Sequence, residues 1–452
     1  MGMFYTFSPK TPNINKRVVR IQIPTKIYKK IKNNFVKINV NGTELIDKIT
    51  SEKRFVIPKE QKIIFSNQNI VKIEIIKNKK RKKKSFIVNK KIDILNWLPE
   101  KNREEVKINI IGNKDNLTCF IKNFKGRVRQ VIIKKYVPLE FCRLLGYYQA
   151  EGGKEKIIKK RRGREVVITN TNLDLVKDFI FLSKYLIDAS NWNAEIKLTK
   201  RNELKEKFII KELIKLGVKK NKIKIRKEKK LKDFSIRLSI CSTLLSDIIL
   251  NFMNCIRKKL IERRPLGKNY KIMYINFMQG LFSGDGNYNT FKNKDGGTHH
   301  RLIFYEGNKN YAIDYQKLLR NEGIKSNIIK IKDKNLYIIR TTLNWELLLL
   351  LKELNLFDYH KKHKEALVSS IKSHKRYKSN KYLIKLGDNF NIKQICEVSN
   401  KSKVICYNWI KKMVNNNLIV KNKINDWSSS LGGKRIKGIL KNLENKGTNP
   451  SH

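Results

Sequence analysis

One order of predicted elements occurs twice in this chain, and this internal duplication constrains the fold more than any single helix or strand. Hydrophobic periodicity and turn residues predict the first copy as a helix opening at 138–140 and ending at Glu151, strands 156–160 and 165–169, helix 173–187, strands 194–198 and 234–240, and helix 244–256. They predict the second copy as helix 270–283, strands 287–291 and 301–305, helix 311–321, strands 324–331 and 336–340, and helices 345–354 and 361–373. We therefore expect an α+β fold of two pseudo-symmetric αββαββα repeats, at 137–260 and 268–373.

The first helix of each repeat ends in the same short pattern. The two copies read LLGYYQAEG and MQGLFSGDG, so that each has a glycine, four residues, an acid and another glycine. Gly146 and Gly280 stand in mid-helix, where glycine costs about 1 kcal/mol relative to alanine. Ala150 and Gly284, four residues later, lie on the same helical face and are also small. The spacing predicts two helices that pack closely side by side as the interface between the repeats.

The acids of this pattern, Glu151 and Asp285, are the candidate catalytic residues. Each stands at the C-terminal end of its helix, where the helix dipole disfavours a carboxylate. Two carboxylates that lie close together also repel each other. A bound divalent cation relieves both problems, so we expect Glu151 and Asp285 to be ligands of a metal ion, Mg²⁺ or Mn²⁺.

The charge of the chain points to a polyanionic partner. Lys and Arg number 101 against 39 for Asp and Glu, which gives a formal net charge of +62. An AT-rich coding sequence would inflate lysine but would not explain why the acids fail to keep pace. A compact protein with this imbalance repels itself, and binding a phosphate backbone relieves the repulsion by releasing counterions. We therefore expect a nucleic-acid partner.

Several other classes of protein are disfavoured by the same sequence. No run reaches the ~18–20 apolar residues that a membrane helix needs, and residues 1–16 lack the apolar core of a signal peptide. The six cysteines form no CxxC pair, which argues against a structural zinc site. We expect an intracellular, cytoplasmic protein with reduced cysteines, access to DNA and no membrane contact.

The flanks predict accessory domains. Alternating apolar and polar residues with an Asn41-Gly42 turn indicate a β-rich domain within 1–100, followed at 79–84 by six consecutive cations. Two amphipathic stripes around a turn near Ser402 predict a helix-turn-helix-like, winged-helix-like domain at 380–425. From 426 to 452 we expect a basic, loosely ordered tail.

The duplicated motif, on about residues 137–373, resembles the LAGLIDADG homing endonucleases. The resemblance implies that the paired helices form the interface between two half-domains, and that each sheet forms a saddle over the DNA major groove. It also implies that Glu151 and Asp285 bind metal near the scissile phosphates, which would yield a double-strand break with short 3′ overhangs. Because both half-sites lie in one chain without intein ends, it implies a free-standing monomer.

The resemblance also implies a basic residue near each active site. In the second repeat, segment 357–364 offers Lys361 or Lys362, of which we select Lys361. In the first repeat Lys258 and Lys259 hold a comparable place, and we select Lys258. Basic residues on or beside the predicted strands are candidates for phosphate or guanine contacts, although the strand register is not fixed by the sequence. They are Arg162, Arg164, Lys197, Arg301, Lys330, Lys332 and Arg340.

Histidines offer a further set of candidate ligands. His299, His300, His360 and His363 stand in basic surroundings, where phosphate contact or surface exposure is the simpler interpretation than metal binding.

Three other functions remain open. A relative that has lost cleavage would be a transcription regulator, an intron maturase would bind structured RNA, and a packaging protein would need the charge without the acid pair. Metal dependence separates the nuclease from the regulator and the packaging protein, and a preference for folded intron RNA identifies the maturase.

Overall fold

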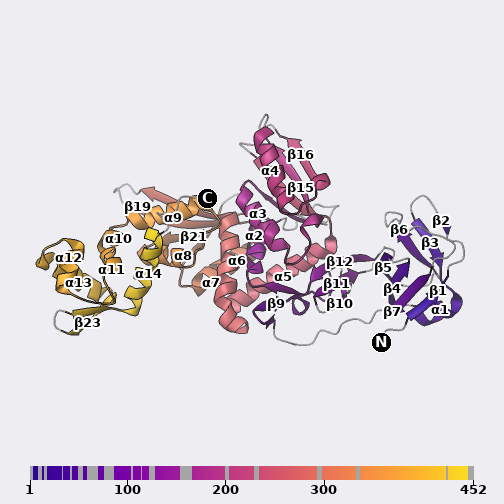
Figure 1. Ribbon diagram of the computed structural model, residues 1–452, viewed down its shortest axis with the longest axis horizontal. Coiled ribbons are helices and arrows are strands. Elements are labelled where there is room, and N and C mark those ends of the chain that lie inside the picture. The colour runs from indigo at the N-terminus through magenta and orange to yellow at the C-terminus, as the bar shows by residue number, and fades with distance from the viewer. Residues whose placement is uncertain are drawn as a thin grey trace. The chain divides into compact units, whose positions relative to one another are not determined.

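The computed structural model describes residues 4–8, 13–14, 18–32, 34–40, 43–48, 54–58, 70–75, 86–102, 105–112, 115–121, 128–152, 165–198, 203–228, 234–292, 298–331, 336–423 and 426–445. Figure 1 labels the helices and strands of the chain. The chain divides into two compact units, each formed by two segments. The first unit contains Met1–Phe141 and Gly152–Ile256, and the second contains Cys142–Glu151 and Arg257–His452. The first motif copy is thereby grouped with the second. None of the helices in the described ranges is long and apolar enough to cross a membrane.

The N-terminal part of the first unit is rich in strands, as its alternating sequence predicts. The elements are β1 (Phe4–Phe7), β2 (Asn13–Ile14), β3 (Val18–Gln22), α1 (Thr25–Ile31), β4 (Phe35–Val40), β5 (Thr43–Lys48), β6 (Arg54–Pro58) and β7 (Val71–Ile75). They form a sheet of order β1-β7-β4-β5 and another of order β2-β3-β6. The antiparallel pairing of β4 with β5 confirms the predicted hairpin, whose turn residues 41–42 lie outside the described ranges. Helix α1, which the strand pattern did not predict, buries Tyr28 and Ile31 against the same core.

Residues 86–138 add two small sheets that the sequence did not predict. Their elements are β8 (Ile87–Val88), β9 (Lys91–Asp93), η2 (Ile94–Asn96), β10 (Asn109–Gly112), β11 (Asn116–Ile121), β12 (Arg129–Lys134) and β13 (Tyr136–Pro138). The expectation that Pro138 opens a helix is wrong, because Pro138 ends β13 and pairs with Lys91. Proline lacks a backbone N–H and is accommodated at a strand end. Helix α2 begins at Phe141 instead and runs to Glu151. The six-cation run at 79–84 lies outside the described residues.

The rest of the first unit forms one sheet with helices. Its elements are β14 (Val166–Asn170), α3 (Leu173–Ser183), η3 (Ala189–Asn191), β15 (Asn193–Leu198), α4 (Glu203–Lys215), η4 (Lys220–Lys222), β16 (Ile223–Lys227), β17 (Phe234–Ile240) and α5 (Thr243–Glu262). The sheet order is β14-β17-β15-β16. Three predicted strands and two predicted helices are confirmed, whereas strand 156–160 and the basic tip with Arg162 and Arg164 lie outside the described ranges. Helix α4 and strand β16 fill the stretch between β15 and β17, for which no element was predicted.

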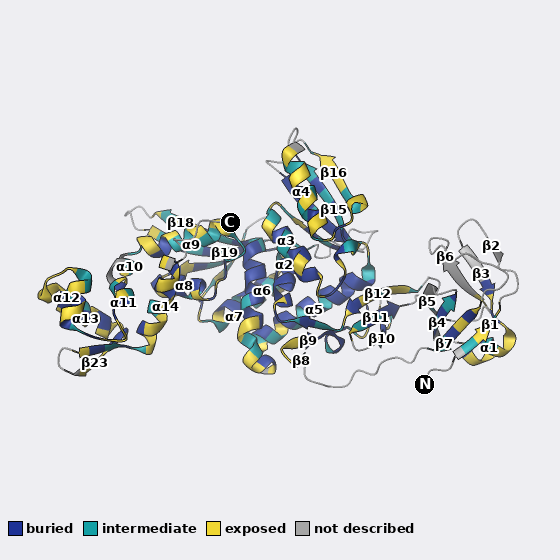
Figure 2. Cartoon of the chain, in the orientation of Figure 1, coloured by how far each residue is buried: buried dark blue, intermediate teal, exposed yellow. Residues whose placement is uncertain are grey.

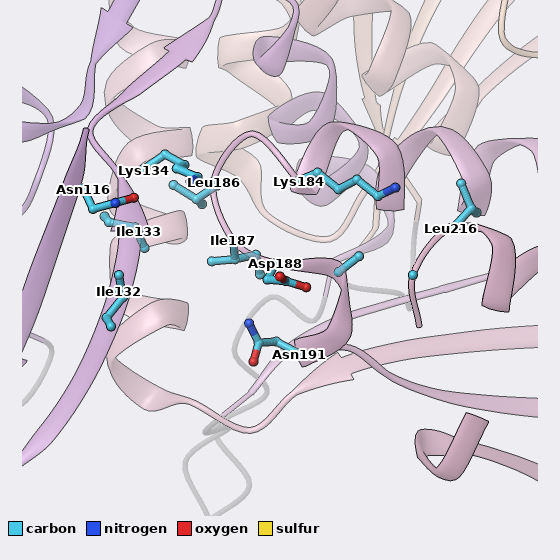
Figure 3. A pocket seen from close by; sticks show the side chains of 12 residues that line it. Asn116, Ile132, Ile133, Lys134, Lys184, Leu186, Ile187, Asp188, Asn191 and Leu216 are labelled. Carbon is cyan, nitrogen blue, oxygen red and sulfur yellow. The ribbon is translucent and has the colours of Figure 1, made fainter. Parts of the chain in front are cut away.

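A cavity of about 480 Å³ lies in this unit between β12, the turn after α3 and the end of α4 (Figure 3). Its one acidic lining residue, Asp188, accepts a hydrogen bond from the Ser190 backbone N–H at 2.7 Å and caps η3. That hydrogen bond holds the pKa of Asp188 below its ordinary value. The carboxylate therefore serves the local fold, and the cavity suggests no chemistry.

The second repeat lies entirely in the second unit. Its elements are η5 (Arg264–Asn269), α6 (Tyr270–Asp285), β18 (Gly286–Lys292), β19 (Thr298–Glu306), α7 (Lys309–Asn321), β20 (Asn327–Lys330), β21 (Tyr337–Leu343), α8 (Trp345–Glu353) and α9 (Lys361–Ser373). The sheet order is β18-β19-β21-β20, with every neighbouring pair antiparallel. Each predicted helix and strand of this repeat is present within a few residues. Figure 2 shows the middle of α6 as buried, in agreement with its sequence of buried residues from Phe277 to Ser283.

The C-terminal residues form a separate core in the second unit. The elements are α10 (Lys375–Asn380), α11 (Tyr382–Lys385), β22 (Asn389–Asn391), α12 (Ile392–Ser399), α13 (Lys403–Asn415), β23 (Ile419–Lys423), β24 (Asp426–Ser429) and α14 (Leu431–Asn445), and the three strands form a sheet of order β22-β24-β23. The expectation of a loosely ordered tail from 426 is wrong for the described residues. Helix α14 buries Leu440 and Leu443, and Arg435 forms an ion pair with Glu353 of α8. Burial of this apolar stripe outweighs the low helix propensity of its glycines.

Candidate active site

Helices α2 and α6 approach each other at their glycines. A Cβ added to Gly146 would lie 2.1 Å from the backbone oxygen of Phe277, and one added to Gly280 would lie 2.1 Å from the backbone oxygen of Arg143. Each of these oxygens belongs to the residue three positions before the other helix's glycine, so the contact is reciprocal. Only glycine permits such close packing of two helix backbones. The close approach that the spacing predicts is therefore present.

The packing of α2 on α6 determines where the two acids lie. Glu151 is the last residue of α2, and Asp285 is the last residue of α6. A Cβ on Gly284 would lie 2.4 Å from the Cβ of Ala150 and 3.1 Å from the Cγ of Glu151. The Glu151 side chain thus lies against the residue that precedes Asp285. Both acids are partly exposed, which leaves them accessible to a ligand at the paired helix ends.

The donor set fits a hard divalent cation. Carboxylate oxygens are preferred ligands of Mg²⁺, which binds through one or two carboxylates together with waters and substrate phosphates. In the described ranges no group of three or more His, Cys, Asp or Glu side chains is arranged to hold a metal ion. Among the described residues, the two acids are the candidate carboxylate ligands, and water and phosphate oxygens would add to the shell. Such an incomplete shell suits an ion that must also bind substrate.

Buried polar groups line the helix pair, and sequence reasoning did not identify them. Arg257 of α5 donates to Asp314 of α7 at 2.9 Å and also to the Oε1 of Gln149, and its guanidinium lies 4.2 Å from the Tyr311 ring centre. Arg257 is only 3% exposed. A buried charge is tolerated only when it is paired in this way. Arg257 therefore links α7 to the end of α2. The residue it contacts on α2, Gln149, lies two positions before Glu151.

A second buried arginine joins the helices directly. The Arg143 guanidinium donates to the Asn276 side-chain oxygen at 2.9 Å and lies 3.9 Å from the ring centre of Tyr359. Gln279, one residue before Gly280, donates to the Asn355 backbone oxygen at 3.1 Å. The Arg143–Asn276 contact holds α2 in register on α6, and the Gln279–Asn355 contact fixes α6 on the segment after α8.

Segment 357–364 lies beside the end of α6. Phe357 packs edge-to-face on Phe282, and Asp358 forms an ion pair with Lys364 at 3.1 Å. His363 shares a hydrogen bond with the Gly286 backbone, next to Asp285, and burial lowers the His363 pKa to about 4. Lys361 begins α9 and is exposed. Sequence reasoning selected this segment but favoured its lysines over His363, because an imidazole beside a buried ring gives no signal in the sequence.

The remaining candidates near the site occupy different environments. Lys258 is exposed on α5, next to the buried Arg257. His300 is buried, and its Nδ1 lies 3.1 Å from the Tyr288 hydroxyl and 3.2 Å from the Thr290 hydroxyl. His299 stacks on Phe291. In the described ranges these histidines join no cluster of metal-ligating groups. The burial of His300 differs from the surface position that its basic surroundings suggested.

Strand register sorts the basic candidates of the second sheet. Arg301 pairs with Thr342 and with Asn289, and Ile303 pairs with Arg340, so that Arg301 and Arg340 share one face. Alternate residues of β19 that face the other way, such as Leu302 and Phe304, are buried. Arg301 and Arg340 therefore lie on the uncovered face.

Lys330 points the other way. It pairs with Tyr337, which places it on the face of Ile339 rather than that of Arg340. It is exposed at the strand end, but the register separates it from Arg301 and Arg340. Lys332 lies outside the described residues.

The first unit's sheet has the same division. Ala194, Ile196 and Leu198 alternate as buried residues of β15, and Lys197 lies on the other face with Glu195. Arg237 of β17 pairs with Glu195 in the ladder and forms an ion pair with Glu165. Lys197 forms an ion pair with Glu228 at 3.1 Å. The uncovered face is therefore charged, and Lys197 lies on it.

Known proteins provide an independent comparison. Residues 273–380 match the family model described as the LAGLIDADG-like domain, whereas no curated protein matches the chain significantly. Among solved structures, the chain is similar to I-DmoI in complex with DNA and Mn, at 21% identity and a TM-score of 0.27, over 45% of this chain and 89% of that one. It is also similar to the meganuclease I-SmaMI bound to uncleaveable DNA, at 13% identity and a TM-score of 0.29, over 52% of this chain and 91% of that one. The chain therefore contains a LAGLIDADG-like domain at 273–380, the region of the second motif copy.

Proposed function

We propose that this protein is a site-specific DNA endonuclease of the homing type, which hydrolyses phosphodiester bonds in both strands of a long duplex target. The observation that carries the proposal is the reciprocal contact of Gly146 and Gly280, which brings Glu151 against the end of α6 at Asp285. A chain that only bound DNA would gain nothing from two carboxylates at adjacent helix ends, where the dipole and mutual repulsion disfavour them.

The roles of the residues follow from their chemistry. Glu151 and Asp285 would hold Mg²⁺ or Mn²⁺ through their carboxylates at the paired helix ends. A divalent cation held by these residues would supply Lewis-acid chemistry, lowering the pKa of a water molecule and offsetting charge on the phosphate and on the leaving oxygen. Lys258 and Lys361 would contact phosphates and offset negative charge beside the acids. Arg143 and Arg257 would act only as positioning residues, since they hold the helices rather than the substrate.

The sheets would provide the duplex-binding surface. Lys197, Arg301 and Arg340 lie on uncovered sheet faces, where they can reach phosphate or guanine. The net charge of +62 supplies long-range attraction to DNA. A single chain carries both acids, so we propose that the active species is a monomer.

The C-terminal residues support a second DNA-binding module. We propose that α11–α13 with the β22-β24-β23 sheet form a winged-helix-like domain. One face of α13 buries Cys406, Ile410 and Met413, while Val404 remains 71% exposed. The helix contains no acidic residue and several lysines, which favours contact with a phosphate backbone. The β-rich residues 1–100 would be a further accessory domain.

This module also favours a rival function. A transcription regulator would need the winged-helix-like domain and the sheet surfaces but no cleavage. An intron RNA maturase would use the same basic surface on folded RNA. Neither rival accounts for both acids at the helix ends, which is why we place the endonuclease first.

A cleavage selection tests the proposal. The purified protein would be incubated with a randomised duplex library and with its own flanking locus, in Mg²⁺, in Mn²⁺ and in chelator. We expect metal-dependent double-strand breaks at one long site. Selective duplex binding without breaks under any metal would favour the regulator, and preference for folded intron RNA would favour the maturase.

A further inference from the structure

The β14-β17-β15-β16 sheet of the first unit has an additional strand at one edge, compared with the β18-β19-β21-β20 sheet of the second unit. In the second unit β20 is followed directly by β21, and the two strands pair antiparallel. In the first unit, residues 199–233 intervene between the equivalent strands β15 and β17, and they contain α4 and β16. Strand β16 pairs parallel to β15, a direction that requires a crossover, and α4 provides it. Among the described strands, β16 is the outermost in its sheet and has no equivalent in the other sheet.

The register shows which face the added strand extends. Ile223 and Ile225 pair with Ala194 and Ile196, whose side chains are buried, so these residues share the face of the buried β15 side chains, although Ile225 itself is 42% exposed. Helix α4 contacts α3, and it buries Ile209 and Leu213.

The other residues of β16 continue the uncovered face. Lys224 pairs with Glu195, and Arg226 pairs with Lys197, the candidate for DNA contact on the neighbouring strand. Both β16 side chains are exposed. The added strand therefore brings two cations and no acid to this face.

The environment of Arg226 suits phosphate. Its guanidinium lies 3.7 Å from a carboxylate oxygen of Glu195, and its side chain is 68% exposed. An exposed ion pair of this kind stabilises by at most about 1 kcal/mol, so a phosphate can compete for the guanidinium. The other Glu195 oxygen lies 4.0 Å from Arg237. Glu195 thus contacts two arginines on the same face, while Lys197 beside them forms an ion pair with Glu228.

We propose that β16 is a phosphate-binding extension of the first unit's DNA surface, with Lys224 and Arg226 contacting the duplex backbone beyond the segment that β14, β17 and β15 cover. This inference rests on the proposed DNA-binding function but not on cleavage. Strands are spaced about 4.8 Å apart, and bases are stacked about 3.4 Å apart. One added strand therefore lengthens the footprint by about one to two base pairs, on one side of the target only.

The cations of β16 could instead have a purely structural role at the edge of the sheet. Lysine and arginine on an outer strand also discourage edge-to-edge pairing with another molecule. That role alone would leave the DNA footprint unchanged, so the footprint decides between them.

The test uses the full chain with Glu151→Gln, so that binding is measured without cutting. Its duplex site is selected from a randomised library in Ca²⁺ and mapped by hydroxyl-radical footprinting. The double variant Lys224→Ala with Arg226→Ala is then compared with Lys220→Ala with Lys227→Ala. The control removes the same charge from the same region, because Lys220 is in η4 and Lys227 lies on the opposite face of β16.

We expect the first variant to lose protection of about one to two base pairs at one end of the site. We also expect a shallower slope of log Kd against log salt concentration for this variant. The decrease in slope should correspond to the loss of about two phosphate contacts. The control should keep the full footprint. An unchanged footprint in both variants, or equal loss in both, would overturn the inference. If the footprint shortens but the chain with native Glu151 cuts the selected site in neither Mg²⁺ nor Mn²⁺, the inference stands and the endonuclease is overturned. Failure to select any duplex would overturn both.

Discussion

Gly146 and Gly280 face each other across the α2–α6 contact, each leaving room for a backbone oxygen that a Cβ would meet at 2.1 Å. A backbone atom cannot move aside as a flexible side chain can, so a methyl group at either position forces the helices apart. Because the acids stand five residues beyond each glycine, that displacement reaches the site itself. Stability and cleavage should therefore respond together to changes at these glycines.

Gly146→Ala and Gly280→Ala are each predicted to destabilise the protein by about 1–3 kcal/mol, the usual cost of overpacking, and to reduce cleavage. Urea unfolding checks the stability and a strand-break assay the activity. Gly438→Ala is the matched control, because a Cβ there would meet nothing within 4 Å. In that exposed position of α14 the gain in helix propensity should stabilise by up to about 1 kcal/mol. Equal effects at all three glycines would contradict the close approach.

Arg257→Met should cost about 3–5 kcal/mol, because it leaves Asp314 without its buried ion-pair partner and Gln149 without its donor. The adjacent Lys258→Met removes the same charge at an exposed position and should change stability by less than about 0.5 kcal/mol. Chemical denaturation of both variants makes the comparison. Similar stabilities would mean that the Arg257 network does not hold α2 in place.

Lowering the pH below about 6.5 should destabilise the second unit. Burial lowers the pKa of His363 to about 4 from 6.5, and burial also lowers the pKa of His300, His360 and His374. The unfolded chain then binds protons before the folded chain does, so this contribution is present above pH 6.5 and is lost as the pH falls toward 4. After discounting for partial exposure, His363 alone should cost on the order of 1 kcal/mol at pH 5.

Thermal unfolding between pH 7.5 and 5 measures this effect. The variant His363→Asn, which cannot be protonated in this range, should show a smaller decrease in stability over the same interval. If the decrease is the same in both proteins, the imidazole at Gly286 is not the source.

Helix α14 should be part of the C-terminal core rather than a dispensable tail. Leu440 is fully buried, and Leu440→Ala should destabilise this region by about 2–5 kcal/mol. The neighbouring Lys441→Ala is exposed and should be nearly neutral. Hydrogen exchange on α12 and α13 would resolve the local effect. Unchanged exchange in the leucine variant would contradict the packing of α14 on this core.

The elements that the sequence predicted well are those whose signal is local. The pattern around Gly146 and Gly280 combined helical periodicity, small residues on one face and a terminal acid, and each part requires the same pair of helices. The strands of the second repeat alternate clearly, as in β19, where Leu302 and Phe304 are buried between less buried neighbours. Because the same order of helices and strands occurs twice, each copy supports the assignment of the elements in the other.

Other elements depend on contacts that the sequence does not display. Strand β16 is exposed along most of its length and is defined by parallel pairing with β15, which no local pattern reports. The uncovered faces could be assigned only from the register. Helix α14 is different, because Ile436, Leu440 and Leu443 have helical spacing. Its glycines and lysines are also typical of a loosely ordered tail, which is why the sequence predicted one.

The most direct test of the central claim is a strand-break assay on the selected duplex with single acid variants. The unmodified chain, Glu151→Gln, Asp285→Asn and the control Glu140→Gln would be compared in Mg²⁺ and in chelator, with both strands resolved. Our account predicts cutting of both strands by the unmodified and control proteins in Mg²⁺ only, and loss of cutting with retained duplex binding in Glu151→Gln and Asp285→Asn. Cutting that persists in either acid variant, or in chelator, would contradict it.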